Sequence, residues 1–175
     1  MRSRHRVVFG YVVGLLALWL ARPTLFSILL ALPLLIVGEA IRLWASGHID
    51  KTRSLATGGP YAHTRNPLYL GSAFLAIGVA VACSSLTVAA LVALYVAAFY
   101  PSVIREESAF LKEKFGAPYE AWAREVPAFL PRLTPAGPRS TRFSWSGVAR
   151  NREWRTALAL PPLLLLLMAR RLLPI

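Results

Sequence analysis

The stretch GPYAHTRNPLYLG, residues 59–71, decides how this chain is interpreted, because it stands where a polar loop meets a long apolar run. The glycines and proline at positions 58–60 form a turn signal. Asn66 followed by Pro67 is typical of an N-cap and the first turn of a helix. We therefore expect a helix over residues 67–83, where the apolar run continues.

A helix start does not account for the other groups in this stretch. Each of these groups also has a separate structural explanation. Arg65 could reach toward lipid phosphates, and Gly71 could allow close helix packing. Tyr61 and Tyr69 could belong to an interfacial aromatic belt. A shared binding site would explain all four together, so the sequence leaves both interpretations open.

The composition is that of a membrane protein. The 175 residues are 56% hydrophobic and only 16% charged, whereas soluble domains have about 45–50% apolar and about 25% charged residues. We predict an all-α fold: one integral membrane helix bundle over residues 1–175, with about five transmembrane helices and a cytoplasmic helical segment. The expected spans are residues 7–21, 24–45, 67–83, 86–104 and 157–175.

Two of these spans leave a choice open. The first resembles a signal peptide, but Trp19, Leu20 and Arg22 do not resemble a small-residue cleavage site, so we expect it to be retained. Arg170 and Arg171 interrupt the last apolar segment, which either spans the membrane or lies in its interface.

The net charge of +12 comes from 20 Lys and Arg against 8 Asp and Glu. The cations lie mostly between apolar runs, and no nucleic-acid-binding module is recognisable, so we expect membrane lipids and not nucleic acid as partners. The positive-inside rule places the N-terminus, residues 47–66 and residues 105–155 in the cytoplasm. Within the last of these, Gly116 and Pro118 predict a break between two short helices, and residues 131–156 are expected to form an irregular linker.

Few side chains are candidates for chemistry. Glu106 and Glu107 follow the fourth span and would lie about 100° apart on a helix, so one could face the bundle and the other water. The alternative is a solvated helix end, or pairing with Arg105. Glu39 and Arg42 are three residues apart, a spacing that allows an ion pair within the second span.

The topology brings the candidates to one membrane face. The second span ends there, the third begins there and the fourth ends there, so Arg42, Asn66, Tyr69 and Glu107 should surround a polar pocket. A single cysteine, Cys83, excludes an intrachain disulfide and is expected to be a buried apolar residue.

The three histidines, His5, His48 and His63, are scattered along the sequence, and no metal-ligand pattern is visible. His63 lies beside the expected pocket. It is either a general base or an ordinary loop histidine.

These residues carry a family resemblance. GPYAHTRNPLYLG, then EE, then FGAPYEAW and VPAFLP, resemble the isoprenylcysteine carboxyl methyltransferase family and its phospholipid N-methyltransferase relatives. The resemblance covers residues 45–130, which we take as the cofactor-binding core. It implies an integral membrane methyltransferase that uses S-adenosyl-L-methionine, placed in a bacterial inner membrane with its active site on the cytoplasmic side.

The resemblance also assigns roles to residues. Arg65 and Glu107 are the expected catalytic residues. Asn66 replaces the histidine that is commoner in the family, and Arg53 stands where the family often has histidine. The expected cofactor contacts are Arg53, Ser54, Leu55, Ala56, Tyr61, Asn66, Pro67, Leu68, Tyr69 and Glu107.

The methyl acceptor is not fixed by the resemblance. The substrate-binding arginine of the prenylcysteine enzymes falls on Val103, and Arg105 is a possible substitute. A hydrophobic or lipid-like carboxylate, amine or thiol is expected, and the oligomeric state is left open. The competing functions are an NADPH-dependent membrane reductase of sterol-reductase-like architecture and a non-enzymatic membrane scaffold.

Overall fold

A computed structural model describes residues 2–49, 54–137 and 142–172, and every regular element in these ranges is a helix. This confirms the all-α prediction. The elements are α1 (Arg2–Leu20), α2 (Leu25–His48), the short 3₁₀ helix η1 (Gly59–Ala62), α3 (Pro67–Cys83), α4 (Leu86–Phe115), α5 (Ala117–Glu125), α6 (Trp145–Arg150) and α7 (Trp154–Arg171).

Local sequence signals set most helix ends. Thr24 and Ser27 form a capping box at the start of α2. Helix α3 has the predicted bounds, with Pro67 in its first turn and Ser84 in the left-handed conformation at its end. Helix α4 extends beyond the predicted span of residues 86–104. It continues to Phe115, because residues 105–115 are mostly good helix formers, and it stops at Gly116, whose φ is 56°.

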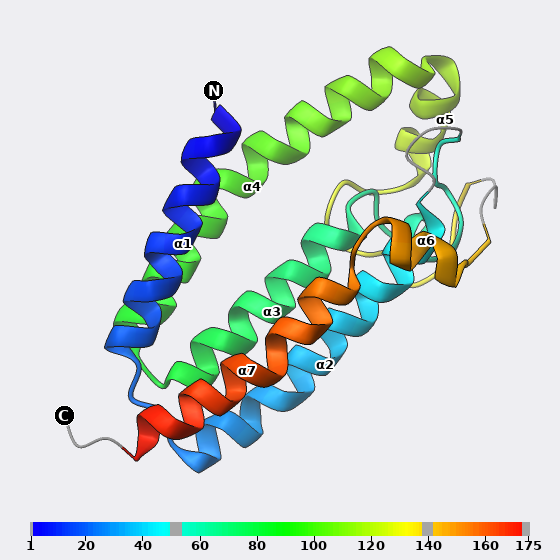
Figure 1. Cartoon of the computed structure of the whole chain (residues 1–175). Coiled ribbons are helices and arrows are strands. Elements are labelled where there is room, and N and C mark those ends of the chain that lie inside the picture. The colour runs from blue at the N-terminus through cyan, green and yellow to red at the C-terminus, as the bar shows by residue number, and fades with distance from the viewer. Residues whose placement is uncertain (1, 50–53, 138–141, 173–175) are drawn as a thin grey trace.

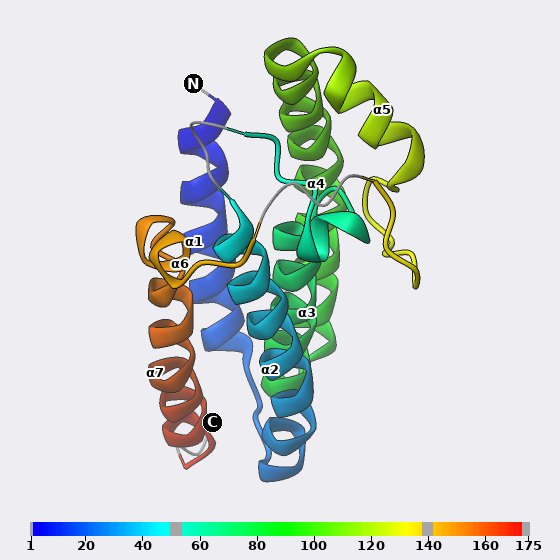
Figure 2. The same cartoon turned by 90° about the vertical axis from the view of Figure 1, so that its right-hand side faces the viewer.

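The helices form two groups that meet at one end of the molecule (Figure 1). Helix α2 packs most extensively against α3, and α7 lies beside α2. Helix α1 packs mainly against α4. The join at residues 21–24 reverses the chain direction, but α1 packs against α4 and α3 and not closely against α2. Helices α5 and α6 and η1 lie at the end where α2 finishes and α3 begins (Figure 2).

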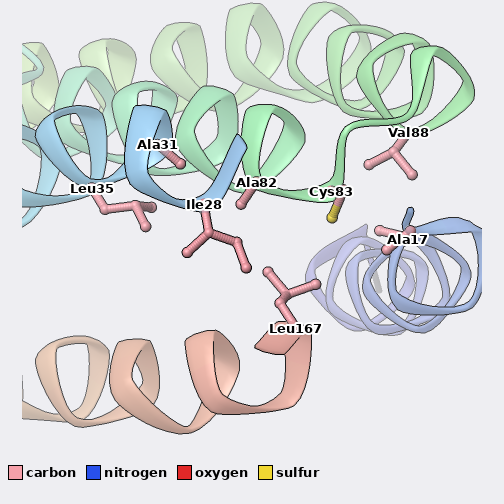
Figure 3. Packing of buried hydrophobic residues seen from close by; sticks show 9 residues of the cluster. Ala17, Ile28, Ala31, Leu35, Ala82, Cys83, Val88 and Leu167 are labelled. Carbon is pink, nitrogen blue, oxygen red and sulfur yellow. The ribbon is translucent and has the colours of Figure 1, made fainter. Parts of the chain in front are cut away.

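An apolar cluster holds the opposite end of the bundle together (Figure 3). Ile28 and Leu35 of α2 are buried beside Ala82 and Cys83 of α3, and Leu167 of α7 is fully buried against them. Cys83 is therefore the buried apolar residue that the sequence predicted. The burial of Leu167 shows that α7 is part of the bundle, although Pro161 and Pro162 lie inside it.

Close contact between α2 and α3 depends on two glycines. A Cβ atom on Gly38 would lie 2.8 Å from the Gly71 carbonyl oxygen, and one on Gly71 would lie 2.7 Å from the Gly38 carbonyl oxygen. Real Cβ atoms do not approach backbone this closely. The backbones touch at this crossing, which confirms close packing as one role of Gly71.

Two of the described helices, α2 and α4, are long and apolar enough to cross a membrane. The apolar helices at residues 8–20 and 67–83 are shorter, and α7 is in neither group, so five spans stay a prediction. Only Val88 of α4 is buried. The apolar side chains of α4 therefore cover the outside of the bundle, as in a membrane protein.

The segment predicted as an irregular linker is partly ordered. Helix α6 lies within it, and the amide N–H of Ser144 donates to the Gly47 carbonyl oxygen at 2.9 Å. Asn151 Nδ2 donates to the carbonyl oxygens of Ser46 and Ile49, at 2.8 and 3.2 Å. These bonds fasten the C-terminal segment to the end of α2.

Candidate functional site

A cavity of about 500 Å³ lies where α2 ends, α3 begins and α4 extends past the bundle. Its walls contain all the predicted site residues that the structure describes. Arg53 lies outside the described residues. The predicted residues that line the cavity are Ser54, Leu55, Ala56, Tyr61, Arg65, Asn66, Pro67, Leu68, Tyr69 and Glu107.

The extension of α4 supplies one wall that the sequence analysis did not predict. After Glu107, the lining residues Phe110, Leu111, Lys114 and Phe115 recur at spacings of three and four residues. This spacing is the signature of one helix face, so the signal was present in the sequence. The sequence analysis predicted a short helix before Gly116 but did not place it in the wall of the site.

The loop before α3 is held by the segment that follows α5. The amide N–H of Arg65 donates to the Pro127 carbonyl oxygen at 2.9 Å. The side chain of Asn66 donates to the Ala128 carbonyl oxygen at 2.8 Å and makes no capping bond to α3. Asn66 is the N-cap residue of α3, as predicted, but its side chain joins two loops that are distant in sequence instead of capping the helix.

The Arg65 side chain carries a buried N–H donor that has no hydrogen-bond partner among the described residues. Its Nη1 donates to the Tyr119 hydroxyl at 3.2 Å. Its Nε is buried and has no hydrogen-bond partner there. An unsatisfied buried donor costs about 1–3 kcal/mol, and this one belongs to a residue that lines the cavity. A bound group with an acceptor oxygen would satisfy this donor once the side chain turns Nε toward the cavity.

Tyr61 and Trp122 form an aromatic part of the cavity wall. Trp122 is 2% exposed, and its Nε1 donates to the Tyr61 carbonyl oxygen at 3.1 Å. Burial raises the pKa of the Tyr61 hydroxyl well above its usual value, and the negative charges of Glu107 and Glu153 raise the pKa further. Tyr61 therefore stays neutral in the folded protein at physiological pH.

Tyr61 should make the stability of the protein fall at alkaline pH. An unfolded tyrosine ionises at about pH 10, whereas Tyr61 keeps its proton in the folded state above that pH. The folded state is then favoured in full below about pH 10 and loses about 1.4 kcal/mol for each further pH unit until Tyr61 ionises. Thermal unfolding between about pH 8 and pH 11 should show a shallower decline for Tyr61→Phe than for wild type. Parallel curves would contradict this.

Arg42 lines the cavity but does not pair with Glu39 as its spacing allowed. Its Nε donates to Glu153 Oε1 at 2.7 Å, and its Nη1 donates to the Ser72 hydroxyl. Both carboxyl oxygens of Glu39, which is 8% exposed, have no hydrogen-bond partner among the described residues. Arg42 pairs with Glu153 and not with Glu39, because the packing of α7 against α2 brings the Glu153 carboxylate within hydrogen-bond distance of the guanidinium.

Only one of the two adjacent glutamates lines the cavity, and neither is buried in the bundle. Glu107 lines the cavity, and Glu106 is not part of its lining, although both side chains are exposed. Arg105 is exposed and does not line the cavity.

His63 is not a lining residue either, and its Nδ1 lies 2.8 Å from the Arg132 carbonyl oxygen. The geometry therefore favours a loop-fastening role for His63.

No group of three or more His, Cys, Asp and Glu side chains within the described ranges is placed to hold a metal ion.

The sequence matches a family model over most of its N-terminal two thirds. The model is described as phospholipid methyltransferase and matches residues 6–118. No solved structure matches the chain.

Three curated proteins are similar to the chain. Nickel-cobalt-cadmium resistance protein NccN of Alcaligenes xylosoxydans xylosoxydans is 36% identical over 118 residues, covering 66% of this chain and 54% of the relative. Cobalt-zinc-cadmium resistance protein CzcN of Cupriavidus metallidurans is 41% identical over 95 residues, 53% and 44% of the two chains. Protein-S-isoprenylcysteine O-methyltransferase of Schizosaccharomyces pombe is 32% identical over 84 residues, which cover 48% of this chain and 36% of the relative. The matches span about half the length of these relatives or less.

Proposed function

We propose that this chain, which belongs to the phospholipid methyltransferase family, is a membrane methyltransferase that uses S-adenosyl-L-methionine and methylates a hydrophobic or lipid-like acceptor. The similarity to an isoprenylcysteine methyltransferase supports the reaction class. The observation that carries the proposal is the cavity, because the predicted cofactor residues from α3, α4, η1 and the loop at residues 54–58 line one space.

The cavity fits the chemistry of this cofactor at the Arg65 side chain. The cofactor carries a carboxylate, and a guanidinium binds carboxylates with two or more N–H groups. The unpartnered Nε of Arg65 is such a group, and Tyr119 fixes the orientation of the same guanidinium through Nη1. In this proposal Arg65 binds the carboxylate, which would remove the cost of the orphan donor.

The other lining residues suit the remaining polar groups of the cofactor. When bound, the cofactor supplies an electrophilic methyl group on a positively charged sulfonium. The aromatic rings of Tyr61 and Tyr69 line the cavity, and such rings favour a nearby cation. Glu107 can accept hydrogen bonds from an amino group or from ribose hydroxyls. Transfer of a methyl group needs orientation and exclusion of water more than covalent help from the protein.

A second hollow supports a hydrophobic acceptor. It measures about 650 Å³ and runs along α3 and α4, with a lining that is almost entirely apolar and includes Ala73, Ile77 and Ala93. Tyr69 of the first cavity meets Tyr100 of α4 edge to face, 5.5 Å between ring centroids, and Tyr100 lies along α4 between the residues that line the two hollows. We propose that the hydrocarbon part of the acceptor lies along this seam and that its reacting group enters the first cavity.

The length of α4 supports a cytoplasmic site. Its 30 residues span about 45 Å, more than the roughly 30 Å hydrocarbon core of a bilayer. The cavity wall from Glu107 onward therefore belongs to the part that projects out of the membrane. Five spans, counting α1, α3 and α7 beside α2 and α4, and an inner-membrane location with a cytoplasmic cavity complete the proposal.

Calorimetric binding of S-adenosylhomocysteine to the detergent-purified protein tests this function, with NADPH titrated in parallel. Micromolar binding of S-adenosylhomocysteine and no binding of NADPH is the expected result. Binding of NADPH alone would replace the proposal with a membrane reductase. Binding of neither ligand by a folded sample would favour a scaffold.

Glu107→Ala is expected to remove S-adenosylhomocysteine binding at micromolar concentrations without unfolding the bundle. Glu107 lines the cavity and is exposed, so its loss removes a ligand contact and little packing. Glu106→Ala is the matched control, because Glu106 has the same charge and is also exposed but is not a lining residue. Equal binding by the two variants would remove Glu107 from the site.

A further inference from the structure

The Arg42 guanidinium is held from two neighbouring helices. Its Nε donates to Glu153 Oε1 at 2.7 Å, and its Nη2 donates to the Thr156 hydroxyl at 3.3 Å, both at the start of α7. Its Nη1 donates to the Ser72 hydroxyl of α3. The Arg42 side chain is 19% exposed and that of Glu153 is 7% exposed. This is a desolvated ion pair in which three contacts fix the plane of the guanidinium.

Glu153 comes from a part of the chain that the family model does not cover, since the match ends at residue 118. Arg42 lies within the matched region and lines the cavity together with Ser72. The C-terminal segment therefore reaches the cavity through Arg42, across 111 positions of sequence.

The arrangement leaves part of the guanidinium unused. A guanidinium has five N–H donors, and the three bonds to Glu153, Ser72 and Thr156 use one donor on each nitrogen. One N–H on each terminal nitrogen is left for other acceptors. Arg42 lines the cavity and its side chain is 19% exposed, so the side chain is not sealed away from the cavity.

We propose that Glu153 is a positioning residue for this cavity: it orients Arg42 so that the two remaining N–H groups of the guanidinium meet an oxygen of the bound ligand. The two N–H groups of the guanidinium would recognise a carboxylate or hydroxyl oxygen. Only the choice of S-adenosylhomocysteine as the probe rests on the proposed function. Ser72 and Thr156 complete the orientation, and Arg42 is the residue that touches the ligand.

Three variants test the inference by calorimetry with S-adenosylhomocysteine. Glu153→Gln keeps the size of the side chain and removes its charge, and it should weaken binding about tenfold. Arg42→Gln should weaken binding at least as much. The double variant should bind no more weakly than Arg42→Gln alone, because Glu153 acts only through Arg42. Independent, additive losses would overturn the inference.

Asn151→Ala is the control for a merely structural role of the C-terminal segment. Asn151 fastens this segment to the end of α2 without touching Arg42. The variant should lower the unfolding temperature and leave the affinity for S-adenosylhomocysteine unchanged. A loss of affinity equal to that of Glu153→Gln would mean that docking of the segment, and not the position of Arg42, controls the cavity.

A second readout needs no ligand. Phenylglyoxal modifies accessible arginines, and peptide mass spectrometry gives the rate for each site. Arg42 should react several-fold faster in Glu153→Gln than in wild type, while the exposed Arg124 reacts equally in both. Equal rates at Arg42 would overturn the inference. If wild type bound no S-adenosylhomocysteine, the proposed function would fail, and these rates would still decide whether Glu153 positions Arg42.

Discussion

Replacing Arg65 with methionine is expected to weaken S-adenosylhomocysteine binding about a hundredfold, or about 2.7 kcal/mol. The guanidinium is the cationic group of the cavity with a buried, unpartnered donor, and a charge-assisted contact to a ligand carboxylate contributes on this scale. The stability of the ligand-free protein should not fall. Methionine keeps much of the packing volume and removes the orphan Nε, so the unfolding temperature should stay at the wild-type value or rise.

Two further variants separate charge from geometry at this position. Arg65→Lys keeps the positive charge but not the planar fork, and it should recover only part of the affinity. Tyr119→Phe removes the hydroxyl that accepts from Arg65 Nη1, and it should cost less than Arg65→Met because the guanidinium is still present. Calorimetry together with thermal unfolding gives both quantities. Wild-type affinity in Arg65→Met would show that Arg65 does not bind the cofactor.

Gly71→Leu is expected to lower the free energy of unfolding by about 3 kcal/mol and to disturb the cavity as well. Any Cβ at position 71 would lie 2.7 Å from the Gly38 carbonyl oxygen and 2.6 Å from Arg42 Cγ. The backbone of α2 cannot move aside cheaply, because α2 and α3 share the largest helix contact of the described chain. The two helices would separate, and Arg42 would lose its position beside Ser72.

Gly14→Ala is the matched control for this substitution. Gly14 lies within α1, and a Cβ atom there would meet nothing within 4 Å. Its replacement should be neutral or should stabilise the protein by up to about 1 kcal/mol, because alanine favours helix over glycine. Thermal unfolding of both variants in one detergent compares them directly. Equal stability of Gly71→Leu and wild type would contradict the close approach of α2 and α3.

The local sequence was sufficient for the features that depend on neighbouring residues. Pro67 and the end of the apolar run predicted both ends of α3, and Gly116 predicted the break before α5. The alternation of apolar runs and basic segments also predicted that Arg42, Tyr69 and Glu107 would gather at one end of the bundle, where they line one cavity. These predictions succeeded because helix termination and chain reversal are decided within a few residues.

The tertiary structure alone decided which partner each polar group takes. Arg42 had an acidic residue three positions away in Glu39, yet it pairs with Glu153 at the start of α7. Asn66 occupies the predicted N-cap position of α3, yet its side chain fastens its loop to Ala128 instead of capping the helix. The sequence determined which residues form helices and which ends of those helices meet. Partner choice depends on which helix faces lie against each other, and that is set by packing between distant segments, which no local spacing encodes.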